Sequence, residues 1–228
     1  MQEPTALRAE IHSTLLDRLT TNHWRPGEHL SIDGLARELN VSPTPVREAM
    51  VALERTGLVN YRAKRGYIVA PPLDRTQISQ LIEARLVMER AALSKAISTS
   101  WLQFSQTLRE AQERQRRAAA SAQEGDHIDY SRLREYLDAD ITFHRAFFEY
   151  AENEFLSAMH EGLGGHAHRM RQSLARGREF FDFPETLSEH EQILMRVEER
   201  NHDGALAALE RHLMNVRDRF GAGGTAAC

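Results

Sequence analysis

The sequence predicts a mainly α-helical protein of two domains: a small N-terminal domain over residues 1–72 and an antiparallel bundle of about six helices over residues 73–220. Three observations lead to this prediction. The length of 228 residues accommodates two modest domains, each able to bury a core. Apolar residues recur at helical spacing through most of the chain. A proline pair, Pro71-Pro72, ends a strand-like stretch and supplies a linker between the domains.

Composition excludes several classes of protein. Hydrophobic residues make up 41% of the chain and charged residues 27%, which is ordinary for a globular protein. No stretch approaches the roughly 20 apolar residues of a membrane-spanning helix, and the N-terminus lacks a signal-like pattern, so we expect a cytoplasmic protein without a membrane partner. The single cysteine, Cys228, lies in a Gly/Ala-rich tail (221–228) that we expect to be flexible. Any metal must therefore be held by histidines and carboxylates.

Charge is distributed unevenly along the chain. The formal net charge of −4 argues against indiscriminate binding to nucleic acid. Residues 1–72 hold nine Lys/Arg and eight Asp/Glu, or +1, whereas residues 73–228 hold twenty and twenty-five, or −5. A weakly basic N-terminal domain joined to an acidic C-terminal domain is consistent with one domain that contacts DNA and another that has a different role.

The first two helices of the N-terminal domain are marked at their ends. Helical spacing of leucine and isoleucine predicts a helix over residues 7–22, which the turn at 24–27 ends. Ser31 is a suitable N-cap for a short second helix. Asn40 can adopt the left-handed conformation that ends this helix.

A third helix and a hairpin follow. The stretch Ser42-Pro43-Thr44-Pro45 predicts a helix start, since proline lacks the N–H that the first turn leaves unpaired, and the helix runs to about residue 57. Residues 58–61 and 67–70 are strand-like and flank a basic turn at 62–66. They predict a two-stranded hairpin.

Two short helices joined by a tight turn and followed by a hairpin form a winged helix-turn-helix. In this fold the second helix enters the major groove of DNA and the hairpin lies along the backbone. The exposed face of the third helix presents Thr44 and Arg47, and its N-terminus, with Ser42, offers hydrogen-bond donors to a phosphate. Arg65 lies in the basic turn. Alone, Arg47 or the turn could be ordinary solvated surface, but their order and spacing together favour DNA binding.

In the C-terminal domain, breaks separate the helical segments, and their positions are residues 98–100, 125–129, 153, 177–184 and 201–204. The arginine-rich stretch 114–122 predicts a solvated helix face.

Four residues of this domain form a candidate metal site. Asp140 and His144 are four apart, so they project from one helix face. His190 and His212 lie on two successive helices whose antiparallel packing could bring them level. One carboxylate and three imidazoles suit a divalent ion, zinc foremost, with nickel, manganese or iron as alternatives. Spacing alone leaves open that these are surface, hydrogen-bonded or core residues.

The N-terminal domain resembles the GntR family of bacterial regulators. The stretches that carry the resemblance are residues 26–30 (PGEHL), 35–39 (LAREL), 41–49 (VSPTPVREA) and 57–59 (GLV). The resemblance implies that Arg47, with Ser42 and Thr44, contacts the operator and that Gly66 lets the wing tip approach the minor groove. The chain departs from the family pattern at Pro43, where many members have arginine, so the family's sequence preference does not carry over.

Residues 74–220 resemble the FCD effector domain of the FadR-type subfamily. The matching stretches are residues 83–89 (EARLVME), 140–144 (DITFH), 189–194 (EHEQIL) and 204–213 (GALAALERHL). The resemblance implies a divalent metal bound by Asp140, His144, His190 and His212. It also implies that Arg85 faces the cavity, where a guanidinium can hold a carboxylate. An Arg85–Glu89 pair four apart on the helix is the alternative.

These observations together predict a dimeric, ligand-responsive transcription regulator. We expect a homodimer that binds an inverted-repeat operator in double-stranded DNA, acts as a repressor, and is controlled by a small organic acid, a carboxylate effector, bound at the metal site. We expect no enzymatic activity. A helical metalloenzyme and a constitutive dimeric DNA-binding protein without an effector are the alternatives.

Overall fold

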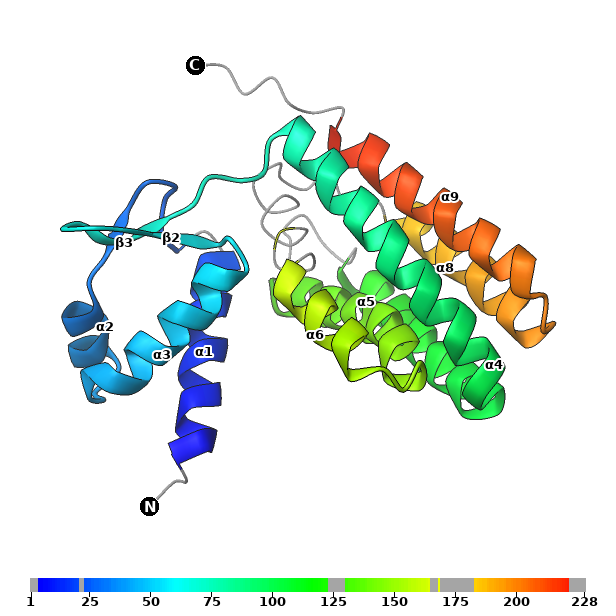
Figure 1. The fold of residues 1–228 in the computed structure, drawn as a ribbon, viewed down its shortest axis with the longest axis horizontal. Coiled ribbons are helices and arrows are strands. Elements are labelled where there is room, and N and C mark those ends of the chain that lie inside the picture. The colour runs from blue at the N-terminus through cyan, green and yellow to red at the C-terminus, as the bar shows by residue number, and fades with distance from the viewer. Residues whose placement is uncertain (1–3, 21–22, 123–129, 165–167, 169–182, 222–228) are drawn as a thin grey trace. The chain divides into compact units, whose positions relative to one another are not determined.

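The computed structural model describes residues 4–20, 23–122, 130–164, 168 and 183–221. It divides into two compact units: Met1–Leu73 with Glu161–Gly177, and Asp74–His160 with Arg178–Cys228. The described residues form eight helices and one small sheet (Figure 1), so the predicted mainly helical class is confirmed. None of the described helices is both long and apolar enough to cross a membrane.

Three helices build the first unit: α1 (Pro4–Thr20), α2 (Ile32–Glu38) and α3 (Pro43–Arg55). The predicted caps are present, since Ser31 Oγ accepts a hydrogen bond from the Gly34 N–H at 3.2 Å and Asn40 has a φ of 54°. The prolines of α3 lie in its first turn, as predicted. Fully buried leucine and methionine side chains from α1 and α3 form the core of this unit: Leu15, Leu19, Met50 and Leu53.

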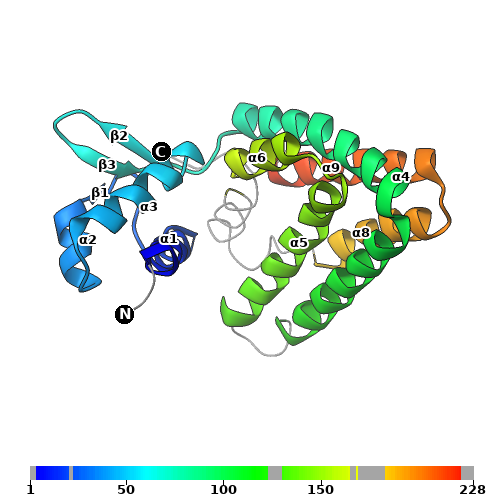
Figure 2. The ribbon, with the colours of Figure 1, turned by 60° about the horizontal axis from the view of Figure 1, so that its bottom comes forward.

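The wing is a three-stranded antiparallel sheet in the order β1-β3-β2 (Figure 2), made of β1 (His29–Leu30), β2 (Val59–Arg62) and β3 (Gly66–Val69). The predicted hairpin is therefore present but incomplete, because β1 pairs with β3 and was missed. A strand of two residues is too short for alternation to reveal it. At the tip, Lys64 and Gly66 have positive φ angles of 67° and 74°.

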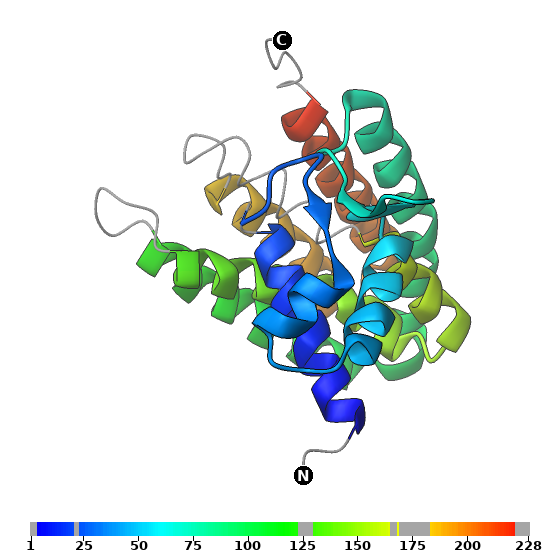
Figure 3. The ribbon, with the colours of Figure 1, turned by 90° about the vertical axis from the view of Figure 1, so that its left-hand side faces the viewer.

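Five labelled helices follow: α4 (Arg75–Ala122), α5 (Tyr130–Tyr150), α6 (Glu154–Leu163), α8 (Phe183–Glu198) and α9 (His202–Gly221). Helix α4 packs against α5, α8 and α9. It changes direction along its length (Figure 2), and Ser100 has non-helical angles, at a predicted break. Helices α8 and α9, orange and red, lie side by side (Figures 1 and 3).

Asparagine side chains begin two of these helices. Asn153 Oδ1 accepts hydrogen bonds from the backbone N–H groups of Phe155 and Leu156 at 3.1 and 3.2 Å, and Asn201 Oδ1 accepts from Gly204 at 2.9 Å. The breaks predicted at residues 153 and 201–204 are thus confirmed. The break at 125–129 and residues 222–228 of the predicted tail lie outside the described residues.

The interior of the second unit is unusually polar. Eight ionisable or amide side chains are at most 3% exposed there: Arg85, Glu89, Gln112, Gln115, Asp140, His144, His190 and His212. Such groups are rarely buried without partners, so their arrangement indicates a site.

Candidate metal centre and nucleic-acid interface

Helix α3 has an apolar buried face and a polar exposed one. Val46 and Met50 are completely buried, whereas Thr44 and Arg47 are exposed. Ser42 is the N-cap residue, and its hydroxyl makes no capping hydrogen bond. The predicted DNA-contacting side chains of this helix therefore lie at its surface.

An open hollow of about 600 Å³ lies between α3 and the wing. Arg47, Lys64, Arg65 and Gly66 line it, and these include three cations. A Cβ added to Gly66 would lie 3.0 Å from His29 Nε2, and φ there is 74°, so a side chain at this position would be strained and would crowd the His29 ring. The structure thus brings Arg47, Arg65 and Gly66 to one surface.

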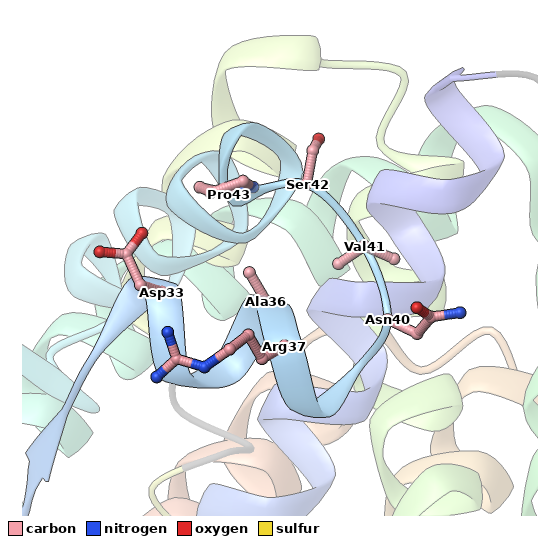
Figure 4. A pocket seen from close by; sticks show the side chains of 7 residues that line it. All are labelled: Asp33, Ala36, Arg37, Asn40, Val41, Ser42 and Pro43. Atoms are coloured by element: carbon pink, nitrogen blue, oxygen red, sulfur yellow. The ribbon is translucent and has the colours of Figure 1, made fainter.

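A second hollow lies at the turn between α2 and α3 (Figure 4). Ser42 and Pro43 lie at one side of it, and Asp33, Arg37 and Asn40 also line it. Ser42 therefore lies at the start of α3 and is not among the residues that line the hollow beside the wing. Sequence reasoning missed Tyr61, a β2 side chain that is 57% exposed and lines the wing hollow.

The predicted metal ligands meet in the interior of the second unit. Helix α5 supplies Asp140 and His144, α8 supplies His190 and α9 supplies His212. The three histidines are fully buried, and one ring nitrogen from each lies within 4.8 Å of the others. The rings of His190 and His212 are 4.7 Å apart, so packing of α8 on α9 does bring them level.

Each imidazole is held through its Nδ1 atom. His144 Nδ1–H donates to Glu89 Oε2 at 2.8 Å, and His212 Nδ1–H donates to Glu189 Oε2 at 2.8 Å. His190 Nδ1–H donates to Gln115 Oε1 at 2.9 Å. Metal-binding histidines characteristically use one nitrogen in this way, which fixes the tautomer and gives Nε2 to the ion.

The two carboxylates are in turn held by arginines. Arg85 Nε donates to Glu89 Oε1 at 2.6 Å. Arg219 donates to both oxygens of Glu189, at 2.7 and 2.8 Å. Burial raises the pKa of Glu189, but hydrogen bonds from Arg219, His212 and Asn215 outweigh it and lower the pKa below its ordinary value. Glu189 is therefore a carboxylate at neutral pH.

Asp140 lies beside the three histidines. Its carboxylate is 1% exposed, its Oδ1 lies 3.7 Å from His190 Nε2, and it accepts a hydrogen bond from Gln115 Nε2 at 3.1 Å. The described histidine cluster thus has an anionic neighbour at its edge, close enough to join it as a fourth donor.

The surroundings of His144 favour its neutral imidazole, which is the form that can bind a metal. Burial, followed by the nearby Arg85 guanidinium, holds the pKa of His144 well below its ordinary value, although Asp140 acts in the opposite direction. A neutral imidazole is the form that binds a metal. Buried imidazoles, a carboxylate and hydrogen-bonded second partners together form a donor set that fits a divalent ion such as zinc.

Arg85 makes the ion pair that the sequence offered as its alternative role. It is 3% exposed and bonds Glu89 through Nε. Its Nη2 atom has no hydrogen-bond partner among the described residues. Arg85 can therefore keep its ion pair with Glu89 through Nε and still offer Nη2 to the carboxylate of an effector.

Sequence reasoning missed the residues that hold the histidines: Glu89, Gln115 and Glu189. Gln115 lies in the stretch 114–122, predicted as a solvated face. Its arginines are exposed as predicted, but Gln115 is fully buried and Ala118 and Ala119 are each 3% exposed. Spacing of three and four residues from Gln115 to these alanines was the signal for a buried face.

Family models match both parts of the chain. The model of bacterial regulatory proteins of the gntR family matches residues 7–69, and the FCD domain model matches residues 80–215. The HTH-type transcriptional regulator LutR of Bacillus subtilis is 28% identical over 215 residues, covering 85% of this chain and 92% of LutR. The HTH-type transcriptional repressor RspR of Escherichia coli is 27% identical over 202 residues, covering 85% and 79%.

Solved structures show the same fold. E. coli McbR/YncC has a TM-score of 0.75 at 19% identity, covering 97% of this chain and 99% of that one. A GntR regulator from Rhodococcus sp. RHA1 has a TM-score of 0.74 at 20% identity, covering 96% and 99%. LutR and RspR are named transcriptional regulators, the class of protein that the sequence predicted rather than an enzyme. The chain belongs to the GntR family of bacterial regulatory proteins and carries an FCD domain.

Proposed function

We propose that the protein is a metal-dependent, acid-responsive repressor: a homodimer whose affinity for an inverted-repeat operator is controlled by a small carboxylate bound at the metal centre. The buried three-histidine cluster carries this proposal. Its Nδ1 atoms are all engaged by Glu89, Gln115 and Glu189, an arrangement that a set of merely packed histidines does not need.

His144, His190, His212 and Asp140 would hold the ion, and zinc suits this donor set best. Four protein ligands leave room on an expandable coordination sphere, where the ion would act as a Lewis acid toward a carboxylate oxygen. Arg85 supplies a second, fixed positive charge in the same interior, with one guanidinium nitrogen available to the ligand. A small organic anion is therefore the class of effector that we propose.

For DNA binding we propose that Arg47 reads bases and that Ser42 and Thr44 contact phosphates at the start of α3. Arg65 and Gly66 would bring the wing to the minor groove. The basic lining of the hollow beside the wing supports this, since arginine and lysine provide the phosphate attraction. A single helix-turn-helix seldom gives sufficient specificity, which supports a dimer on two half-sites. The repressor assignment draws on RspR, which is named a repressor.

A matched pair of variants tests the proposal. His212→Ala removes a cluster histidine, whereas His202→Ala removes a histidine of the same helix that instead bonds Ser94. Metal content is measured first, and then small organic acids are screened by thermal shift and by operator binding. We expect about one ion per chain in wild type and His202→Ala, and a ligand that changes operator affinity only in these two.

Two results would contradict the proposal. The first is that wild-type protein from cells grown with ample metal contains no metal, which would rule out the proposed metal centre. Alternatively, His212→Ala could respond to the acid as wild type does, which would separate the response from the histidine cluster. Operator binding by wild type without metal would still support the DNA-binding part.

A further inference from the structure

The three histidines are not held in the same way. His144 and His212 each donate to a carboxylate, whereas His190 donates to the amide of Gln115. Gln115 is fully buried, and its amide makes a second bond, from Nε2 to Asp140 Oδ1 at 3.1 Å. One side chain therefore joins a histidine of α8 to the aspartate of α5.

The chemistry of an amide matches this position. Its oxygen accepts and its nitrogen donates in one rigid plane, so it can bond an imidazole N–H and a carboxylate together. A glutamate could accept from His190 but would turn an oxygen toward Asp140. The Asp140 carboxylate accepts hydrogen bonds, so it identifies the amide end that faces it as nitrogen and leaves the amide oxygen to accept from His190.

His190 needs this bond to point Nε2, rather than a ring carbon, toward Asp140 and the proposed ion. Its ring is stacked on Phe143, with centroids 4.2 Å apart and an interplanar angle of 3°. Stacking fixes the plane of the ring, but a half-turn about the Cβ–Cγ bond keeps that plane and exchanges nitrogen and carbon positions. The hydrogen bond from Nδ1 to Gln115 distinguishes the two orientations, and it directs Nε2 toward Asp140, whose Oδ1 is 3.7 Å away.

We infer that Gln115 is a positioning residue for the metal centre: it aligns His190 and Asp140 together, so that the fourth ligand is in place when the ion binds. This inference rests on the metal site proposed above. It predicts that losing the amide costs metal affinity and alters the coordination geometry, although Gln115 itself does not touch the ion.

The chain offers a matched control one helical turn away. Gln112 lies on the same helix, is 1% exposed, and donates to the Leu187 carbonyl at 2.8 Å. Gln115→Met and Gln112→Met each keep the side-chain length and remove one buried amide. Zn²⁺ affinity is measured by competition with a chromophoric chelator, geometry by the visible spectrum of the Co²⁺ form, and fold by the melting temperature of metal-free protein.

We expect Gln115→Met to lower Zn²⁺ affinity by roughly 10–100-fold and to change the Co²⁺ spectrum. Gln112→Met should lose stability but keep its affinity within about threefold of wild type and an unchanged spectrum, because its bond does not reach a ligand. If Gln115→Met does not fold, Gln115→Glu, which keeps the bond to His190 but not the donor to Asp140, should also lose affinity and alter the spectrum.

A double-mutant comparison links the effect to Asp140. In an Asp140→Ala background, Gln115→Met should cost less affinity than in wild type, because one of its two partners is already absent. The inference is wrong if wild type binds Zn²⁺ and the folded Gln115 variants bind it equally well, or if the two glutamine positions behave alike. If wild type itself binds no Zn²⁺, the proposed metal site fails, and the inference fails with it.

Discussion

The two units place their functional side chains in opposite environments. In the first unit Arg47 and Arg65 are exposed, above a core in which Met50 and Leu53 are completely buried. In the second unit the candidate ligands are themselves the interior, with all three cluster histidines at 0% exposure. In the first unit, therefore, the residues proposed to bind DNA are separate from the buried core. In the second unit the proposed metal ligands are themselves buried in the core.

The largest expected effect comes from comparing two ion pairs: Arg85–Glu89, buried within α4, and Arg90–Glu210, exposed between α4 and α9. Glu89→Ala leaves a buried Arg85 guanidinium without its partner, and should lower the free energy of unfolding of metal-free protein by about 3–5 kcal/mol. Glu210→Ala breaks the pair with Arg90, whose side chains are 48% and 51% exposed, and should cost at most about 1 kcal/mol. Urea unfolding measures both. Equal losses would show that the interior network does not contribute to the fold.

The opposite behaviour is expected at the exposed helix. Arg47→Ala should weaken binding to a specific operator by roughly 1–3 kcal/mol, as for loss of a base contact, while leaving the urea midpoint unchanged. Arg55→Ala, another exposed arginine at the last residue of the same helix, is the control and should bind nearly as wild type does. Titrations by fluorescence anisotropy give the affinities. A destabilised Arg47→Ala protein would undermine the separation of binding from stability.

Removing the N-cap of α9 should change the stability of the second unit without changing metal binding. Asn201→Ala removes the acceptor for the Gly204 N–H at the start of α9, and should cost about 1 kcal/mol of stability. Because the cap lies outside the polar cluster, metal affinity of the folded protein should stay within about threefold of wild type. A large loss of affinity would mean that the position of α9 depends on its first turn.

The smallest effect is expected at the wing. Arg65→Ala should weaken binding to all DNA sequences similarly and reduce the salt dependence by about one unit of slope, since it removes a phosphate contact. Lys95→Ala, an exposed lysine of α4, should leave the slope unchanged. The measurement is affinity at several salt concentrations. A sequence-selective loss in Arg65→Ala would instead indicate that this arginine reads bases.

Features with local signals were predictable from the sequence. Ser31 and Asn40 marked the ends of α2 through their capping preferences, and the four-residue spacing of Asp140 and His144 placed both on one face of α5. Each of these signals involves only residues that are a few positions apart in the sequence.

Features that depend on distant partners were not predictable. Strand β1 exists because β3, almost forty residues later, pairs with it. Gln115 contacts His190, which is 75 residues away; its spacing from Ala118 and Ala119 indicates a buried position, but no pattern along the chain indicates this partner. The partners of such a residue are set by the tertiary fold, so the sequence pattern indicated the candidate ligands but not the residues that hold them.

The arginine beside each supporting carboxylate has a consequence for the order of assembly. Arg85 balances Glu89 and Arg219 balances Glu189 within the polypeptide itself. An unbalanced buried carboxylate would cost several kcal/mol and would make folding wait for a cation. Here a newly synthesised chain can reach its compact state first and acquire the proposed ion later. The proposed ion would then be able to bind to a chain that is already folded.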